Sequence, residues 1–253
     1  MTTGERLTVR ELVNPVVSAT CLALLLALAF LALYVWREWH AYQASEYRRM
    51  TGRGFFGLLR DSGALFEYLV GKDVTHLFPG ARVLFNVYVP KQRGGTSECD
   101  VIALIEGRMV VFECKCYSGW VFGKQDETYW VETFNSRSKN RFYNPIRQNA
   151  GHVKALSAFL GVEPSSLVSI VVFSNRADLK HVKTDGSIPV VKRRQLRKTI
   201  KKALDEPDSV TFNETTLDAL VPLASPDEVV RKEHIESIKR RYDSKERASG
   251  EKD

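Results

Sequence analysis

The sequence has few cysteines, four in 253 residues, and they do not form the pattern of a disulfide-bonded protein. Cys21 lies within a long apolar run, whereas Cys99, Cys114 and Cys116 fall within one short stretch. An odd set of three argues against a disulfide framework and favours a reducing compartment. A zinc site would need a fourth ligand and a CxxC-like spacing, and Cys114 and Cys116 are separated by a single residue.

Internal repeats are also absent, and the composition is not that of a fibrous or disordered protein. Hydrophobic residues make up 44% of the chain and charged residues 26%. A chain of this length can bury one sizeable core with appendages, which favours one or two domains. The formal net charge of +7 fits a phosphate-rich partner, either nucleic acid or an anionic lipid surface, without choosing between them.

One uncharged run, residues 16–36, is long enough to cross a membrane. A helix of this length spans roughly 30 Å, the thickness of a hydrocarbon core. Tyr34 and Trp39 lie where an interfacial aromatic belt forms. A cleaved signal peptide would have a shorter apolar region that ends at small residues, and a soluble helix would carry charges before Arg37. We therefore predict a transmembrane helix over 16–36, preceded by a short tail over 1–15.

Arginines flank this segment unequally, with Arg6 and Arg10 before it and Arg37, Arg48, Arg49 and Arg53 after it. By the positive-inside rule, the large C-terminal part should face the cytoplasm. This orientation agrees with the unpaired cysteines. We expect a single-pass protein of the plasma or inner membrane, with its soluble domain in the cytoplasm.

The soluble part alternates helical and strand patterns, which predicts an α/β (α+β) fold. We expect a juxtamembrane linker over 37–54, a folded domain over 55–205, and a C-terminal helical extension with a disordered charged tail over 206–253. Helices are predicted at about 61–70, 144–160 and 196–204, and from residue 225. Strands are predicted at 82–89, 98–105, 108–116, 120–122, 129–133, 167–174 and 188–191.

Two apolar runs on either side of a glycine predict a β-hairpin. If residues 106–107 form its loop, Asp100 lies directly opposite Glu113 and Glu98 lies opposite Lys115. Residues two apart on a strand share a face, so all four side chains would project from the same face. A loop of three residues would destroy this pairing.

Opposed carboxylates destabilise a sheet unless something offsets their charge, and a divalent cation would do so. Mg²⁺ binds oxygen ligands and keeps several waters, so Asp100, Glu113, the backbone carbonyl of Cys114 and a substrate phosphate would suffice. Lys115 could position the attacking water and stabilise charge on the phosphate. The alternative is the solvated face of an amphipathic hairpin, but the other residues of that face are apolar.

The motif of Asp100 followed by Glu113-Cys114-Lys115 resembles the D…ExK core of the PD-(D/E)XK nuclease superfamily. Within it, the chain resembles the nuclease-related domain (NERD). The similarity covers about residues 62–173, and Cys99 stands where that superfamily often has proline. Further matching features are Gly63–Val70 with Glu67, the segment Ser118–Gly123, Trp130, and the segment Asn144–Asn149.

This resemblance implies a restriction-endonuclease-like αβββαβ core and a Mg²⁺ cofactor, or Mn²⁺ in its place. It also implies that Asp100 and Glu113 are metal ligands, that Lys115 is the catalytic lysine, and that Glu67 and Gln148 support them. Periodicity alone is equally compatible with Glu67 as an ordinary surface glutamate.

Two further features admit a binding interpretation and a structural one. Gln148 and His152 share a helical face, where they could reach a nucleic-acid backbone or pack structurally. A basic run over 192–202 could bind phosphates, or it could be the solvated face of a helix, and no aromatic residues are interleaved with it. Its candidate phosphate contacts are Arg193, Arg194, Arg197 and Lys198.

The sequence therefore predicts a membrane-anchored, metal-dependent nuclease that hydrolyses phosphodiester bonds, with DNA as the expected substrate. The alternative is a catalytically silent, membrane-tethered module that binds nucleic acid or serves as a scaffold, because a fold does not guarantee turnover. A third interpretation is that the basic domain docks on anionic lipid.

Overall fold

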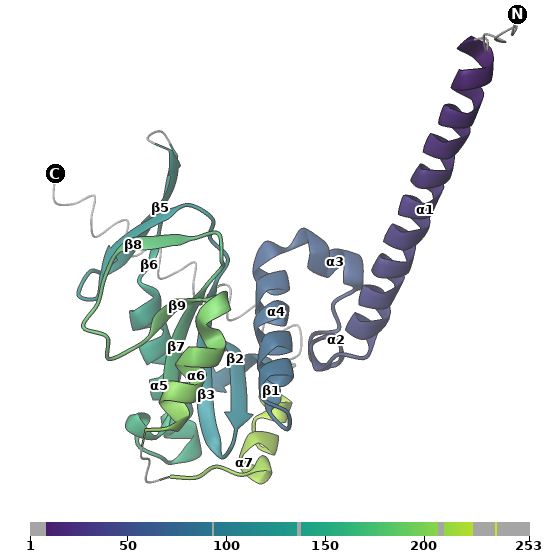
Figure 1. The fold of residues 1–253 in the computed structure, drawn as a ribbon. Helices are drawn as coiled ribbons and strands as arrows, with labels where there is room; N and C mark the ends of the chain where they lie inside the picture. The colour runs from purple at the N-terminus through teal and green to yellow at the C-terminus, as the bar shows by residue number, and fades with distance from the viewer. Residues whose placement is uncertain (1–8, 93, 136–137, 207–209, 225–235, 237–253) are drawn as a thin grey trace, which may run out of the picture. The chain divides into compact units, whose positions relative to one another are not determined.

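The structure is a computed structural model that describes residues 9–92, 94–135, 138–206, 210–224 and 236 (Figure 1). By its internal contacts the chain divides into two compact units, Met1–Ser45 and Glu46–Asp253. The first unit contains one described helix, and the second contains every described strand. The helix predicted from residue 225 falls outside the described residues.

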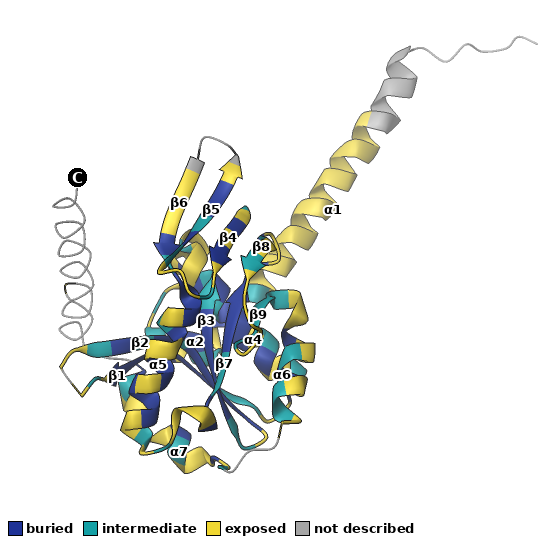
Figure 2. Ribbon diagram, turned by 90° about the vertical axis from the view of Figure 1, so that its left-hand side faces the viewer, coloured by how far each residue is buried: buried dark blue, intermediate teal, exposed yellow. Residues whose placement is uncertain are grey.

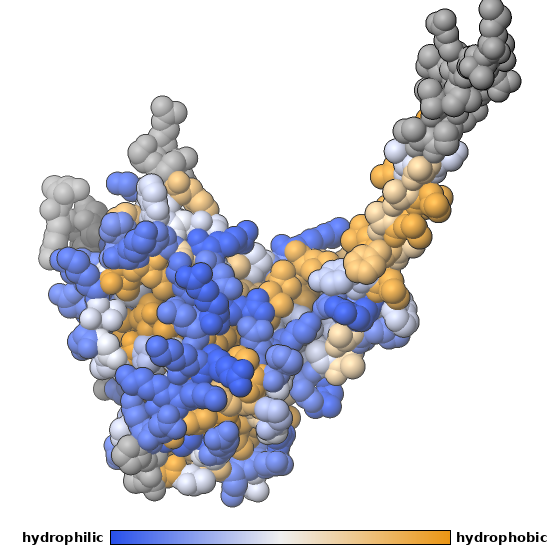
Figure 3. All heavy atoms as spheres, in the orientation of Figure 1, coloured by the Kyte–Doolittle hydropathy of each residue, from blue (hydrophilic) through white to orange (hydrophobic). Residues whose placement is uncertain are grey.

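The first unit is built on one long helix, α1 (Val9–Gln43). Its segment Val17–Gln43 is long and apolar enough to cross a membrane. Leu24, Leu25 and Leu26 are each more than 60% exposed, and successive helical residues point in different directions, so the apolar surface surrounds the helix (Figures 2 and 3). The predicted span over 16–36 lies within α1, which continues beyond it.

The second unit is organised around a five-stranded sheet. Its order is β1 (Arg82–Pro90), β2 (Thr96–Ile105), β3 (Arg108–Lys115), β7 (Val168–Phe173) and β9 (Val190–Lys192). The pairs β1–β2 and β2–β3 are antiparallel, whereas β3–β7 and β7–β9 are parallel. The sheet is therefore mixed, as an α/β protein allows.

Helices cover this sheet on both faces. In the views of Figures 1 and 2, α4 (Ser62–Leu77) and α5 (Pro145–Leu160) lie on opposite sides of it. α6 (Leu196–Leu204) contacts both α4 and β9. The shorter helices are α2 (Glu46–Thr51), α3 (Phe55–Arg60), α7 (Glu214–Asp218), η1 (Pro164–Ser166), η2 (Arg193–Gln195) and η3 (Val221–Leu223). Central strands enclosed in this way need apolar residues on both faces, which explains the near-continuous apolar run of β2.

A second sheet of four strands takes three of them from the chain between β3 and α5 and the fourth, β8, from the chain after β7. Its order is β6 (Ser138–Tyr143), β5 (Tyr129–Asn135), β4 (Trp120–Lys124) and β8 (Asp178–Lys183). The inner face packs on the end of β7, where the ring of Trp130 stacks on that of Phe173 with centroids 6.3 Å apart. Gly123 lies against the same indole, because a Cβ atom there would be 2.2 Å from the Trp130 ring.

The hairpin register predicted from the sequence is confirmed. Ile105 pairs with Arg108, and the antiparallel ladder continues to Val101 and Phe112. Glu106 and Gly107 both have positive φ, 49° and 79°, which is the requirement of a two-residue type I′ turn. The turn chemistry therefore fixes which residues of β2 and β3 face each other.

Most of the other predicted elements are present, with small changes at their ends. α5 begins as expected, with Pro145 in its first turn and the Asn144 side chain accepting the backbone N–H of Ile146. The sequence did not reveal β6, β8 or α7. β6 and β8 are the edge strands of the second sheet, and their polar sequences lack the apolar alternation that identifies a half-buried strand.

Candidate active site

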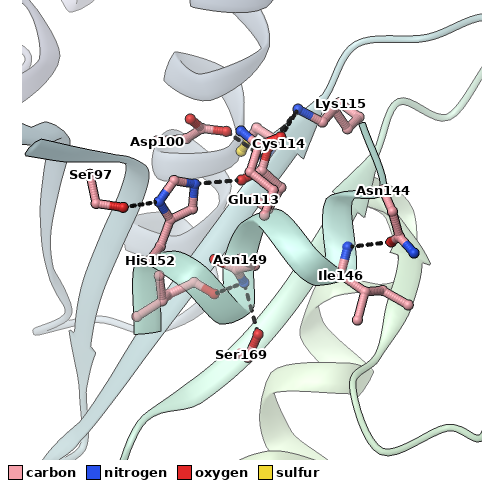
Figure 4. Close-up of polar contacts among 12 residues, drawn as sticks. Ser97, Asp100, Glu113, Cys114, Lys115, Asn144, Ile146, Asn149, His152 and Ser169 are labelled. Atoms are coloured by element: carbon pink, nitrogen blue, oxygen red, sulfur yellow. Dashed lines mark hydrogen bonds and ion pairs between the residues drawn. The ribbon is translucent and has the colours of Figure 1, made fainter. Parts of the chain in front are cut away.

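The candidate site lies where β2 and β3 separate. Their ladder ends at Val101 and Phe112, one residue before Asp100 and Glu113. Beyond it, Asp100 Oδ2 accepts the backbone N–H of Cys114 at 2.8 Å (Figure 4). A carboxylate thus satisfies an amide of β3 just past the last paired residues. The predicted pairing of Glu98 with Lys115 lies beyond the end of this ladder.

Glu113 is fully buried, and both of its carboxylate oxygens have a charged or polar neighbour. Lys115 Nζ lies 2.5 Å from Oε1, and His152 Nε2 lies 3.0 Å from Oε2 (Figure 4). The contact with Lys115 is an ion pair rather than an aligned hydrogen bond. Burial by itself would raise the pKa of Glu113, but Lys115 and His152 outweigh it and hold the pKa below its usual value.

Lys115 is held in place by two partners from different elements. Besides its ion pair with Glu113, its ammonium group donates to Oε1 of Gln148 on α5 at 3.2 Å. Burial opposes the charged form, yet Glu113 and Asp100 hold the pKa of Lys115 above its usual value. The structure therefore brings the predicted lysine and glutamine together, with the lysine charged.

His152 links Glu113 to a further polar residue that the sequence did not indicate. Its Nδ1 lies 2.8 Å from Oγ of Ser97, and its ring is almost fully buried (Figure 4). An ionised Glu113 can only accept hydrogen bonds, so Nε2 of His152 must carry the hydrogen. A neutral imidazole then accepts the Ser97 hydroxyl at Nδ1, which fixes both the ring and the carboxylate. The sequence signal for His152 was its i, i+4 spacing from Gln148, which places both side chains on one face of α5.

Carboxylates crowd the other side of the site. The pKa of Asp100 is raised to about 7, first by burial and then by Glu113, against the opposing effect of Lys115. The pKa of Glu67 on α4 is raised well above its usual value by burial and by the charges of Asp100 and Glu98. Predicted residue Glu67 is thus part of the same electrostatic cluster.

Asn86 bridges two of these carboxylates from β1. Its Nδ2 lies 3.3 Å from both Glu67 Oε2 and Glu98 Oε1, and Tyr88 Oη donates to Glu98 at 2.7 Å. Asn86 has a φ of 49°, an uncommon conformation in a strand, and its Oδ1 is buried without a hydrogen-bond partner. Strain and an unsatisfied oxygen beside an acidic cluster are typical of a functional site.

These donors fit a hard divalent cation. Asp100 and Glu113 supply carboxylate oxygens, and Asn86 Oδ1 is an oxygen still without a partner. Among the described residues no three His, Cys, Asp or Glu side chains are arranged to hold a metal, but Mg²⁺ requires only one or two carboxylates with waters and phosphate. Burial raises the pKa of the Cys99 and Cys114 thiols, which disfavours the thiolates that zinc binds.

Residues 62–174 match the model of the family described as "Nuclease-related domain". This chain carries a nuclease-related domain. The family belongs to the PD-(D/E)XK superfamily, as the motif in the sequence predicted. An uncharacterized protein, pXO1-01, of Bacillus anthracis is 33% identical over 121 residues, which are 47% of this chain and 56% of that protein. The chain thus spans little more than half the length of that relative. No solved structure matches this chain.

The nuclease-related domain contains every predicted catalytic and metal-binding residue, because Glu67, Asp100, Glu113, Lys115 and Gln148 all lie within 62–174. The structure gathers them from β2, β3, α4 and α5. The backbone carbonyl of Cys114 lies between the two site residues of β3. Sequence reasoning missed Ser97 and Asn86, which depend on contacts between distant segments.

The basic run lies outside the nuclease-related domain. Arg193 forms a bidentate pair with Asp73 of α4, at 2.6 and 2.7 Å, so its guanidinium is engaged within the fold. Arg194, Arg197 and Lys198 are exposed. Phosphate binding by this run stays a prediction, carried by those three residues rather than by Arg193.

Proposed function

We propose that this protein is a membrane-anchored nuclease that hydrolyses phosphodiester bonds, with DNA as its substrate and Mg²⁺ or Mn²⁺ as its cofactor. The observation that carries the proposal is the buried Glu113, held between Lys115 and His152 beside Asp100, which lies in the middle of β2. A structural ion pair would not require a second, half-buried carboxylate whose ionisation the first one opposes.

Each residue then has a chemical role. Asp100, Glu113 and the carbonyl of Cys114 would hold the cation, which when bound supplies Lewis-acid stabilisation of the phosphate and lowers the pKa of a water. Lys115, charged in this environment, stabilises negative charge that develops on the phosphate and orients the attacking water. Gln148 fixes the ammonium group through its Oε1.

The arrangement of elements supports the same proposal. Around the first sheet the chain runs α4, β1, β2, β3, α5 and β7, which is the order of an αβββαβ core. Strands β4, β5 and β6 of the second sheet are then an insertion between β3 and α5, and β8 joins them from the chain after β7. We infer that the two sheets together form the nuclease fold, with the site at the end of β3.

Membrane anchoring rests on α1. Its apolar surface on all sides favours lipid surroundings over the surface of a soluble protein. A signal sequence near an N-terminus has a similar composition, so cleavage must be tested. We expect the full chain to stay in the membrane pellet after carbonate extraction. A protease added outside intact cells should leave the C-terminal unit uncut, and its digestion would contradict the cytoplasmic orientation.

The decisive experiment is cleavage by the full chain in nanodiscs. Single- and double-stranded DNA and RNA are each incubated with Mg²⁺, Mn²⁺ or EDTA. We expect metal-dependent cutting that Lys115→Ala and Asp100→Asn abolish. Lys154→Ala, which removes an exposed lysine from α5, is the matched control and should cut normally. Cutting by folded Lys115→Ala and Asp100→Asn at the wild-type rate would overturn the proposed mechanism.

A binding module without turnover is the second candidate, and one observation favours it. Lys115 and His152 already engage both oxygens of Glu113, so a cation must compete for them. In that case the wild-type protein binds DNA with a steep dependence on salt but does not cut it with either metal.

A further inference from the structure

The second sheet has an outer face that combines aromatic and basic side chains. Strand alternation directs Val121, Trp130 and Phe142 inward to the core of this unit, so their neighbours point outward. Trp120 is 51% exposed and Phe122 is 38% exposed, and Figure 2 shows the alternating exposed and buried bands of these strands. We call this surface the outer sheet face, and its principal residues are Trp120, Phe122, Lys139, Arg141, His181 and Lys183.

The register places four side chains in one row across the four strands, three of them flat and one, Val131, aliphatic. Phe122 pairs with His181 on one side and with Val131 on the other, and Val131 pairs with Arg141. The rings of Phe122 and His181 stack with centroids 4.4 Å apart and an angle of 13° between their planes. The Arg141 guanidinium lies 4.0 Å above the ring of Tyr129. The row is therefore a platform of π surfaces that is open to solvent at Phe122.

The charge on this face is mainly of one sign. Lys139, Arg141 and Lys183 are all exposed on its strands. Of the strand carboxylates, Glu132 is 4% exposed and accepts the backbone N–H of Ser118, and Asp178 lies 3.6 Å from Lys180. The other acidic groups near this sheet occupy its turns, as Asp126 does. Phosphate groups complement such a surface better than a neutral or basic partner does.

We propose that the outer sheet face binds single-stranded nucleic acid, with bases stacked on Trp120 and Phe122 and phosphates at Arg141, Lys139 and Lys183. Aromatic side chains in a basic groove or sheet bind single strands because unpaired bases expose their faces, which a duplex keeps stacked. A membrane partner would favour aromatic residues at loop tips that can insert, whereas these lie within strands and between charged residues.

The platform is close to the candidate site along the chain. Trp120 follows Lys115 by five residues, so their Cα atoms are at most about 18 Å apart. A strand held at Trp120 would need to cross at most about this distance to reach the level of Lys115. This inference rests on the proposed function for the choice of nucleic acid as the ligand. It deepens that function by specifying a single-stranded substrate.

The test measures binding separately from cleavage. The full chain in zwitterionic nanodiscs is titrated, in EDTA, with fluorescein-labelled oligodeoxythymidylate and with a labelled duplex, and anisotropy gives the Kd. We expect Trp120→Ala and Phe122→Ala each to weaken single-strand binding about fivefold or more and to leave duplex binding unchanged. Trp120→Tyr, which keeps a ring, should restore most of the affinity. Phe159→Ala removes an exposed aromatic residue from α5 and should have no effect.

The charges give a second readout. Arg141→Gln should reduce the slope of log K against log salt by about 0.7 for a single strand, because one phosphate contact is lost. Wild-type single-strand affinity in the Trp120→Ala and Phe122→Ala variants would overturn the proposal. It would also be overturned if these variants lost binding to anionic vesicles and kept their oligonucleotide affinity.

The cleavage assay keeps the two hypotheses apart. Single-strand binding that depends on Trp120, in a protein that never cuts, supports the outer sheet face and refutes the nuclease. Cutting that depends on Lys115, with single-strand binding insensitive to Trp120 and Phe122, supports the nuclease and refutes the outer sheet face.

Discussion

Asp100 should destabilise the folded protein at neutral and alkaline pH, and Asp100→Asn should relieve this cost. The pKa of the carboxyl rises from 3.8 to about 7, chiefly because burial and Glu113 disfavour its ionised form. Because the folded-state pKa lies above the unfolded value, stability is lost as the pH rises through the interval between the two values. The asparagine side chain keeps the size of aspartate and can still accept the Cys114 N–H.

The size of this stability cost follows from the shift in the pKa of Asp100. About three pKa units correspond to about 4 kcal/mol, at 1.36 kcal/mol for each unit. Asp100 is only partly shielded from solvent, so screening reduces this to about 2 kcal/mol. For a unit of this size, the gain in Tm of Asp100→Asn is about 4–8 °C at about pH 8. At about pH 5 it should be less than half as large, since the folded carboxyl is then protonated.

Thermal unfolding of the full chain in nanodiscs with EDTA, followed by tryptophan fluorescence, measures this gain. Asp126→Asn is the matched control, because it changes an exposed turn residue and should leave Tm unchanged at either pH. A Tm of Asp100→Asn that equals or falls below the wild-type value at about pH 8 would refute the reasoning. So would a gain that grows as the pH is lowered. Loss of cleavage together with a raised Tm would identify a stability cost retained for function.

Two further substitutions test positioning and packing. His152→Ala leaves Glu113 Oε2 without its donor and should cost about 1–3 kcal/mol of unfolding free energy together with a lower kcat, whereas His152→Gln, which keeps a donor, should recover part of both. Equal kcat in the two variants would contradict a positioning role. Gly123→Ala places a Cβ atom 2.2 Å from the Trp130 ring and should destabilise the protein by about 1–3 kcal/mol in urea unfolding. In Gly151→Ala the new Cβ atom, on α5, meets nothing within 4 Å, and this variant should stabilise the protein by about 0.5–1 kcal/mol. If Gly123→Ala were instead the more stable of the two variants, the Trp130 indole would not confine Gly123.

The sequence was sufficient to predict those features that local chemistry determines. The Glu106-Gly107 turn requires positive φ at both positions, so it sets the hairpin register and places Asp100 and Glu113 one residue past the end of the ladder. Asn144 and Pro145 likewise mark the start of α5 because the cap and the fixed φ of proline act locally.

Features that depend on distant contacts could not be predicted in this way. Ser97 reaches His152 across 55 residues of sequence, and Asn86 reaches Glu67 across 19, so no local pattern connects them. The edge strands β6 and β8 gain their structure from hydrogen bonds to β5 and β4, although their own residues are largely polar. Tertiary pairing overrides weak strand propensity at such edges.

The charges of the site explain how it can remain folded without a cation and still be prepared to bind one. With Asp100 protonated, the ammonium group of Lys115 balances the carboxylate of Glu113, and the buried pair is neutral. A divalent ion bound as proposed would add positive charge beside Asp100 and lower its pKa, so its binding would release a proton at or below a pH of about 7. Cation affinity should therefore rise with pH toward about 7 and level off above it.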